Sequence, residues 1–215
     1  MKLEILYERI KSEMPALLYI SGTSCAGKST FAHKLRDNLG YEIIELDKIV
    51  VGSVIRPQGL VDPGAVFAEV YRNRDQRQLI DPFVAAAKQV ISTKLTQNQP
   101  IAIEGALANA ETLSDIFSDY PDFMFIYFHP KNLEIYRRNL TNRFMLADKD
   151  VSSGLPKHFW SLIDEKEFEL FCNTRVITPG LEQSIAAFAL SSQQESVGRL
   201  ANFKATFDRI TVVEV

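Results

Sequence analysis

A glycine-rich stretch near the amino end of the chain has the residue types and the spacing of a phosphate-binding loop. Residues 22–29 match the pattern G-x-x-x-x-G-K-[ST], in which two glycines precede a lysine and a hydroxyl side chain. Glycines let such a loop curl so that successive backbone N–H groups point at phosphate oxygens. We expect a nucleotide to be bound by Gly22, Thr23, Ser24, Cys25, Ala26, Gly27, Lys28, Ser29 and Thr30.

Two side chains at the end of this loop supply chemistry that the backbone cannot. Lys28 places a mobile positive charge near the β- and γ-phosphates of a nucleotide, and we expect it to be catalytic. The Ser29 hydroxyl is a ligand of the kind that Mg²⁺ takes, because this ion prefers a few protein oxygens together with phosphates and waters. The loop therefore predicts ATP and Mg²⁺ as cofactors.

The segments on either side of the loop have the order that the motif requires. An apolar run predicts a buried strand at about 16–21, and the residues after the loop predict a helix that Gly40 ends. The unpaired N–H groups at the start of this helix present the positive end of its dipole to the phosphates.

Strands and helices are predicted to alternate along the rest of the chain. Further strands are expected at 41–46, 101–103, 123–128 and 210–215. Further helices are expected at 2–13, 64–75, 81–96, 110–118, 133–144, 157–172 and 181–206, with loops at 52–63 and 147–156. This alternation predicts an α/β fold of the P-loop NTPase type, a three-layer α/β/α arrangement with a five-stranded parallel sheet and helical lid and acceptor segments. We expect one domain over 1–215, with a lid region at about 137–156.

Composition and charge exclude several classes of protein. The chain has 215 residues, is 46% hydrophobic and carries a formal net charge of −3, which argues against general binding to nucleic acid or to anionic membranes. The apolar runs are too short to span a bilayer, and the charged amino end has no signal-peptide core. Two cysteines, Cys25 and Cys172, make no disulfide framework, so we predict a cytoplasmic protein. Nothing in the composition specifies an oligomeric state.

Two carboxylates follow predicted strands. Ligands of open parallel sheets bind at the carboxyl ends of the strands, where Asp47 follows 41–46 and Glu104 follows 101–103. We expect Asp47 to bind an acceptor hydroxyl and take its proton, and Glu104 to lie on the metal or substrate side. The alternatives are that Asp47 caps the next helix and that Glu104 is a solvated loop carboxylate.

Phosphoryl transfer also needs cations that offset charge on the transferred group. Arg56 could reach an acceptor, or it could be a solvated loop arginine. Arg137, Arg138 and Arg143 precede the polar loop at 147–156, and we expect Arg138 and Arg143 to act in a lid over the phosphates. The same arginines could instead form the solvated face of an amphipathic helix.

These motifs resemble those of a known family. Gly22-Thr23-Ser24-Cys25-Ala26-Gly27-Lys28-Ser29-Thr30, Asp47 after the second strand and Ile103-Glu104-Gly105 after the third look like the P-loop kinases of nucleosides and other small metabolites, with uridine kinases closest. The resemblance spans residues 16–145. It implies that Asp47 activates an acceptor hydroxyl, that Glu104 lies beside metal and acceptor, and that lid arginines cover the phosphates. The chain is also similar to the chloramphenicol phosphotransferase and zeta-toxin group.

The function predicted from the sequence is therefore ATP-dependent transfer of the γ-phosphate to a hydroxyl of a small molecule, with a nucleoside as the first candidate. An antibiotic or another metabolite is an alternative acceptor. A P-loop NTPase or regulatory nucleotide binder is a second alternative, although the guanine motif Asn-Lys-x-Asp and the Ser-Gly-Gly signature of ABC-type ATPases do not occur in the sequence.

Overall fold

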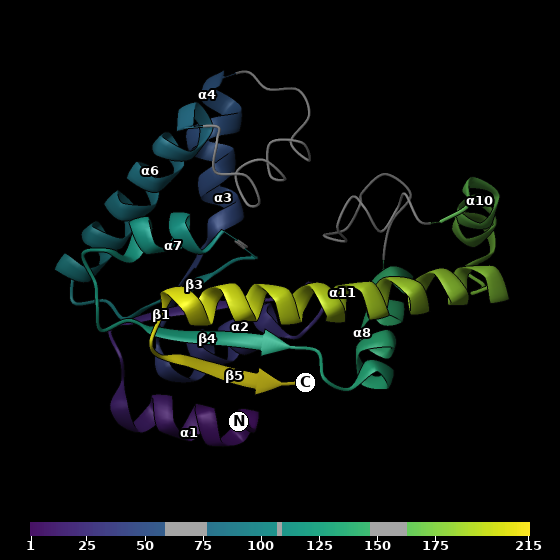
Figure 1. Ribbon diagram of the computed structural model, residues 1–215, viewed down its shortest axis with the longest axis horizontal. Coiled ribbons are helices and arrows are strands. Elements are labelled where there is room, and N and C mark those ends of the chain that lie inside the picture. Colours follow the sequence, from purple (N-terminus) through teal and green to yellow (C-terminus); the bar gives the residue numbers. More distant parts are fainter. Residues whose placement is uncertain (59–76, 107–108, 147–162) are drawn as a thin grey trace.

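The computed structural model describes residues 1–58, 77–106, 109–146 and 163–215. Its five strands form one parallel sheet in the order β2-β3-β1-β4-β5 (Figure 1). The strands are β1 (Leu17–Gly22), β2 (Glu42–Glu45), β3 (Ile101–Glu104), β4 (Met124–His129) and β5 (Ile210–Glu214). The predicted fold class, a three-layer P-loop-type α/β/α fold with a five-stranded parallel sheet, is confirmed.

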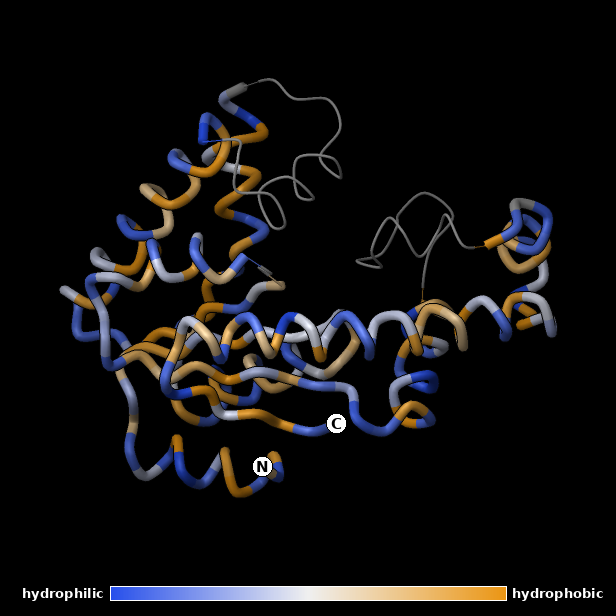
Figure 2. The backbone as a smooth tube through the Cα atoms, in the orientation of Figure 1, coloured by the Kyte–Doolittle hydropathy of each residue, from blue (hydrophilic) through white to orange (hydrophobic). Residues whose placement is uncertain are grey.

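Helices cover both faces of this sheet. Leu18 and Ile20 of β1 pack toward α1 (Leu3–Glu13) and α2 (Lys28–Leu39), whereas Leu17 and Tyr19 pack toward the opposite face. That face is covered by α6 (Arg77–Thr96), α7 (Ala110–Phe117) and the carboxyl half of α11 (Pro179–Thr206). Strands β1 and β4 are almost entirely buried, and their sequences are mostly apolar. Figure 2 shows hydrophobic stretches in the sheet layer and alternating hydrophobic and hydrophilic residues along the helices.

A third hydrophobic cluster lies beyond the carboxyl ends of the strands. It joins α8 (Leu133–Met145), α10 (Glu165–Thr174) and the amino half of α11, through residues such as Tyr136, Phe171 and Phe188. Because α11 has 28 residues, one helix belongs both to this cluster and to the sheet (Figure 1). The position of α8 relative to the sheet is therefore set by α11.

The segment after β2 differs from the sequence prediction. Residues 52–63 were expected to form a loop, but the described part is helical, as α3 (Leu46–Val50), a short π-helix η1 (Val51–Ile55) and α4 (Arg56–Gln58). Val50 and Val54 lie four residues apart and are fully buried against the core, which outweighs the low helix propensity of Gly52. Pro57 lies near the end of this continuous helical segment, directly after the π-helix.

Other boundaries shift by smaller amounts. The helix expected at 81–96 begins at Arg77 and contains Pro82, and the helix expected at 157–172 is described from Glu165 to Thr174. The predicted helix at 64–75 and the predicted loop at 147–156 lie outside the described residues, so the lid region is described only as far as residue 146.

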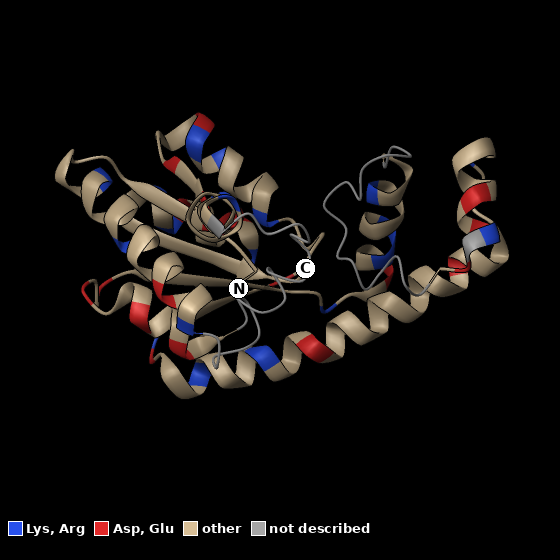
Figure 3. Ribbon diagram, turned by 90° about the horizontal axis from the view of Figure 1, so that it is seen from above, with Lys and Arg blue, Asp and Glu red and all other residues tan. Residues whose placement is uncertain are grey.

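The surface of the described residues carries both signs of charge. Figure 3 shows the positions of acidic and basic residues interspersed along the helices. In the described parts of the chain, we find no helix with the length and apolar character needed to cross a membrane.

Candidate active site

The phosphate loop joins the central strand β1 to α2. Glycine is required at its two ends for different reasons, close packing at Gly22 and a positive φ at Gly27. Gly22 has φ +135°, and a Cβ there would lie 2.3 Å from the Phe128 carbonyl oxygen of β4. Gly27 has φ +94° and precedes α2. Cys25 adopts φ +61° without being a glycine. The loop therefore has the tight curl that the motif predicts, with close approach at its start and left-handed backbone at its end.

Lys28 is buried at the start of α2. Its Nζ donates a hydrogen bond to the Thr23 carbonyl oxygen at 2.8 Å, and the Ala26 N–H points to the same oxygen at 3.4 Å. Burial lowers the pKa of the Lys28 ammonium, and the carboxylates of Glu104 and Asp47 oppose this shift. The Lys28 ammonium and the Ala26 N–H group thus both point to the Thr23 carbonyl oxygen, inside the curl of the loop.

Ser29 and Glu104 meet at the edge of the loop. The Ser29 hydroxyl donates to Glu104 Oε2 at 3.2 Å, because Glu104 at the end of β3 is paired with Ile20 of β1. Burial raises the pKa of the Glu104 carboxyl, while Lys28 and the Ser29 hydrogen bond lower it. A hydroxyl beside a carboxylate fits Mg²⁺, which keeps most of its ligands as phosphates and waters. Within the described ranges, no group of three or more His, Cys, Asp or Glu side chains is arranged to hold a metal by itself.

Asp47 lies in the first turn of α3, one residue beyond where the strand was expected to end, and it is exposed. The preceding residue, Leu46, packs against Gly105, where a Cβ would lie 2.8 Å from the Leu46 side chain. This contact holds the start of α3 against the end of β3. The charge of Asp47 raises the pKa of both Lys28 and Glu104, so the three groups share one electrostatic neighbourhood.

The predicted arginines are placed differently from one another. Arg143 follows Tyr136 by seven residues and so shares the helix face that contacts the loop at Ser24. Burial raises the pKa of the Cys25 thiol, and the charge of Arg143 lowers it. Arg137 instead pairs with Glu182 of α11 at 3.6 Å. Arg138 is exposed and follows Tyr136 by two residues, on nearly the opposite side of α8. Arg143 therefore lies on the loop-facing side of α8, whereas Arg137 pairs with α11 and Arg138 is exposed on another side.

Arg56 is also placed away from the loop. It is exposed in α4, at the far end of the helical segment that begins at Leu46, distant from the ends of the strands (Figure 1). The structure does not bring Arg56 together with Lys28 and Glu104.

Three residues near the site were missed from the sequence. Tyr136 and Asn139 of α8 donate hydrogen bonds to the carbonyl oxygens of Ser24 and Cys25, at 2.9 Å and 3.4 Å. Their spacing with Arg143 indicates one helix face, which is the signal that could have found them. Arg199 of α11 lowers the pKa of Lys28, and no local pattern in the sequence marks it.

Arg199 has an unusual environment for an arginine. Its side chain is 16% exposed, and one Nη pairs with Glu195 one turn earlier at 2.5 Å. Its Nε has no hydrogen-bond partner among the described residues. A largely buried guanidinium with an unsatisfied donor is costly unless an anion completes its hydrogen bonds.

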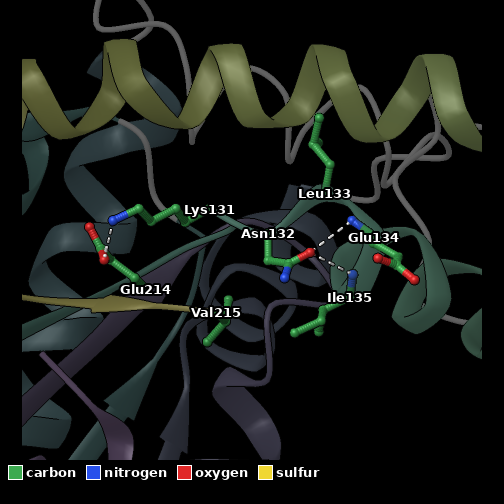
Figure 4. Close-up of a pocket in the computed structure, with 7 residues that line it drawn as sticks. All are labelled: Lys131, Asn132, Leu133, Glu134, Ile135, Glu214 and Val215. Carbon is green, nitrogen blue, oxygen red and sulfur yellow. Dashed lines mark hydrogen bonds and ion pairs between the residues drawn. The ribbon is translucent and has the colours of Figure 1, made fainter.

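A surface depression of about 780 Å³ lies elsewhere, where the end of β5 meets the start of α8 (Figure 4). There Lys131 pairs with Glu214 at 2.7 Å, and Asn132 Oδ1 accepts hydrogen bonds from the N–H groups of Glu134 and Ile135. These contacts cap α8 and fix the end of the sheet. None of the residues that line this depression belongs to the predicted site.

Comparison with known proteins agrees with a P-loop kinase. No protein-family model matches the chain. A shikimate kinase from Chlorobium phaeobacteroides (strain BS1) is 26% identical over 163 residues, which cover 71% of this chain and 73% of the relative.

Solved structures with a similar fold include two further kinases. A shikimate kinase from Bacteroides thetaiotaomicron has a TM-score of 0.47 at 11% identity, covering 90% of this chain and 84% of its own. A gluconokinase from Sinorhizobium meliloti 1021 has a TM-score of 0.42 at 16% identity, covering 87% and 97%. The curated relative supports the prediction of a small-molecule P-loop kinase, and it does not point to uridine kinases in particular.

Proposed function

We propose that this protein transfers the γ-phosphate of ATP, with Mg²⁺, to a hydroxyl of a small metabolite that also carries a carboxylate, as shikimate or a sugar acid does. The observation that carries the proposal is the convergence of Lys28, the Ser29–Glu104 pair and Asp47 at the carboxyl ends of three adjacent strands. The cytoplasm remains the predicted location, from the cysteine content alone.

The residues of the site have distinct roles in this proposal. Lys28 and the loop N–H groups bind the β- and γ-phosphates, and Lys28 exchanges its bond to Thr23 for phosphate oxygens. Ser29 and Glu104 would hold Mg²⁺, which neutralises phosphate charge when bound. Asp47 accepts the hydrogen bond of the acceptor hydroxyl and aligns its oxygen with the γ-phosphorus. As the new P–O bond forms and the bond to the β-phosphate oxygen breaks, the hydroxyl proton passes to Asp47.

Two observations favour an acidic acceptor over a nucleoside. Arg199 is largely buried, has an unsatisfied Nε and lies within electrostatic range of Lys28, so it can pair with an anion near the phosphates. The relative at 26% identity is a shikimate kinase. A nucleoside has no carboxylate and would leave the guanidinium unsatisfied, which such sites reject strongly.

The test is an acceptor screen that measures ADP release from Mg·ATP. The panel holds shikimate, gluconate, their neutral amides, free sugars and nucleosides, with a sample lacking acceptor. We expect turnover with a hydroxylated carboxylate, little with its amide, and an increase of about tenfold or more in KM for the acid in Arg199→Met.

Other outcomes would overturn parts of the proposal. Faster turnover with a nucleoside, or equal turnover with acid and amide, contradicts the acidic acceptor. Rapid ADP release without any acceptor indicates an NTPase, because kinases usually need acceptor-driven closure to exclude water.

A further inference from the structure

The phosphate loop is held from its outer side by α8. Tyr136 is fully buried, and its hydroxyl donates to the Ser24 carbonyl oxygen at 2.9 Å. One turn later, the Asn139 side-chain amide donates to the Cys25 carbonyl oxygen at 3.4 Å. Two consecutive carbonyl groups of the loop are thus fixed by side chains that come from a distant part of the chain.

Fixing these carbonyls also fixes the donors of the loop. In a trans peptide the C=O and the next N–H point in opposite directions. Bonding of the Ser24 and Cys25 carbonyls toward α8 therefore turns the N–H groups of Cys25 and Ala26 away from α8. The Ala26 N–H does point to the Thr23 carbonyl, where the Lys28 ammonium also points. The hydrogen bonds from α8 to the Ser24 and Cys25 carbonyls thus direct the loop N–H groups toward the side on which phosphate would bind.

The supporting helix α8 is itself held by α11. Gln193 of α11 donates hydrogen bonds to the carbonyls of Pro130 and Lys131 at 2.7 Å and 3.0 Å, just before α8 begins, and Phe188 and Ala189 of α11 share a hydrophobic cluster with Tyr136. Since α11 also packs on the sheet, the Tyr136 hydroxyl is tied to the same framework as β1.

We propose that Tyr136 is a positioning residue for nucleotide binding, whose hydroxyl holds the Ser24 peptide so that the loop N–H groups are preorganised for phosphate. The loop needs such a restraint because Cys25 occupies a left-handed conformation at φ +61°, which a non-glycine residue adopts only when its surroundings impose it. This inference rests on the proposed function, since it assumes that the loop binds a nucleotide.

The chain offers a matched control for the test. Tyr41 is equally buried, its hydroxyl also donates to a backbone carbonyl, that of Pro15 at 2.7 Å, and burial raises the pKa of both phenols to about 12. Its hydrogen bond lies at the amino ends of the strands, away from the loop. Tyr136→Phe and Tyr41→Phe therefore delete the same kind of bond in different places.

The experiment measures Mg·ADP affinity by calorimetry and amide hydrogen exchange of the loop. For Tyr136→Phe we expect the Kd for Mg·ADP to rise about five- to tenfold and exchange to quicken in the peptide that contains 22–27. For Tyr41→Phe we expect Kd and loop exchange to stay at wild-type values, with a similar change in Tm. Asn139→Ala should act in the same direction as Tyr136→Phe, and less strongly, because its bond is longer.

The possible failures are distinguishable. If wild-type protein binds Mg·ADP and Tyr136→Phe binds it equally well, the positioning role is overturned and the proposed function stands. Equal losses of affinity in Tyr136→Phe and Tyr41→Phe also overturn the role, because they indicate general destabilisation. Wild-type protein that binds neither Mg·ADP nor Mg·ATP overturns the proposed function and the positioning role together.

Discussion

The Ser29 hydroxyl, in the first turn of α2, donates a hydrogen bond to the Glu104 carboxylate at the end of β3, across 3.2 Å. The two residues are 75 positions apart, and the pairing of β3 with β1 brings them together. The same carboxylate opposes the effect of burial on the Lys28 pKa. Glu104 therefore interacts both with Ser29, the proposed Mg²⁺ ligand, and with the charge of Lys28, the proposed phosphate-binding residue.

The ionisation of Glu104 should limit activity at low pH. Burial raises the pKa of this carboxyl, so Glu104 loses the negative charge that would bind Mg²⁺ at a higher pH than an ordinary glutamate does. We expect kcat/KM to fall on the acid side through this raised pKa, because kcat/KM reports the free enzyme. Glu104→Gln should lower kcat/KM by about 100-fold or more and remove this limb from the pH profile.

A second glutamate provides the control. Glu42 lies at the opposite end of the neighbouring strand β2 and pairs with Lys94 at 2.8 Å. Glu42→Gln should keep both the rate and the acid limb. An acid limb that persists unchanged in Glu104→Gln would assign it to another group.

Glu104→Gln should lower activity but raise the stability of the ligand-free protein. A carboxyl whose pKa is higher in the folded state than in the unfolded state destabilises the fold when it is ionised, and not when it is protonated in both states. Ligand-free Glu104→Gln should therefore have a higher Tm than wild type at neutral pH. The difference should vanish as pH falls through the raised pKa to below the unfolded value, which thermal denaturation at several pH values checks.

Lys28→Ala should separate catalysis from stability. Loss of this charge should lower kcat by at least ~100-fold, the scale of one preorganised contact to the transferred group. The Tm should stay near wild type, because removing a buried ammonium also removes its desolvation cost. In wild type, activity should fall on the alkaline side at a pH below that of an ordinary lysine. Near-normal turnover in Lys28→Ala would contradict a kinase. Lys34→Ala is the control, because Lys34 is an exposed lysine of the same helix that lies over the Tyr7 ring of α1.

The arginines of α8 should behave unequally. Arg143 lies on the loop side of the helix, whereas Arg137 forms an exposed pair with Glu182. We expect Arg143→Ala to lower kcat by about tenfold or more with little change in Tm. Arg137→Ala should keep wild-type kinetics and change the free energy of unfolding by no more than about 0.5 kcal/mol. Equal kinetic effects of the two substitutions would contradict this assignment.

Features that depend on residues close together in the sequence could be predicted from it, whereas features that depend on contacts between distant residues mostly could not. The strand, loop and helix around Lys28 were predictable because the motif and its flanking apolar runs are local. The position of Glu104 on the same side of the sheet as the phosphate loop was predictable from the rule that ligands bind at the carboxyl ends of parallel strands. The helical segment after β2 was not predictable from Gly52 and Pro57, because burial of Val50 and Val54 outweighs their propensities.

Other residues of the site could not be found locally. Arg199 lowers the pKa of Lys28 only because α11 packs on the sheet, which brings together residues far apart in the sequence. Tyr136 contacts Ser24 because α8, which packs on α11, lies beside the loop. Tyr136, Asn139 and Arg143 do share the periodicity of one helix face. That pattern could indicate a common neighbour, but it could not identify the phosphate loop as that neighbour.

Asp47 gives the most informative test of mechanism, because it should act on the acceptor and not on ATP. It is exposed in the first turn of α3, and Gly105 lets α3 approach the end of β3 closely. A carboxylate there can accept the hydrogen bond of an alcohol and take its proton late in the transfer, which typically contributes roughly 10²–10⁴-fold. Asn keeps the shape and one acceptor oxygen but removes the charge.

Asp47→Asn should therefore bind Mg·ATP about as tightly as wild type and lose most of kcat with any acceptor, by roughly 10²–10⁴-fold. Calorimetry with Mg·ATP and single-turnover rates at saturating nucleotide separate the two effects. Glu45→Gln, two residues earlier on β2, is the control for a charge change at the same strand end, since Glu45 pairs with Lys48 at 2.7 Å. If Asp47→Asn instead loses Mg·ATP binding and keeps its single-turnover rate, Asp47 lies on the metal side, and Glu104 becomes the next candidate for the base.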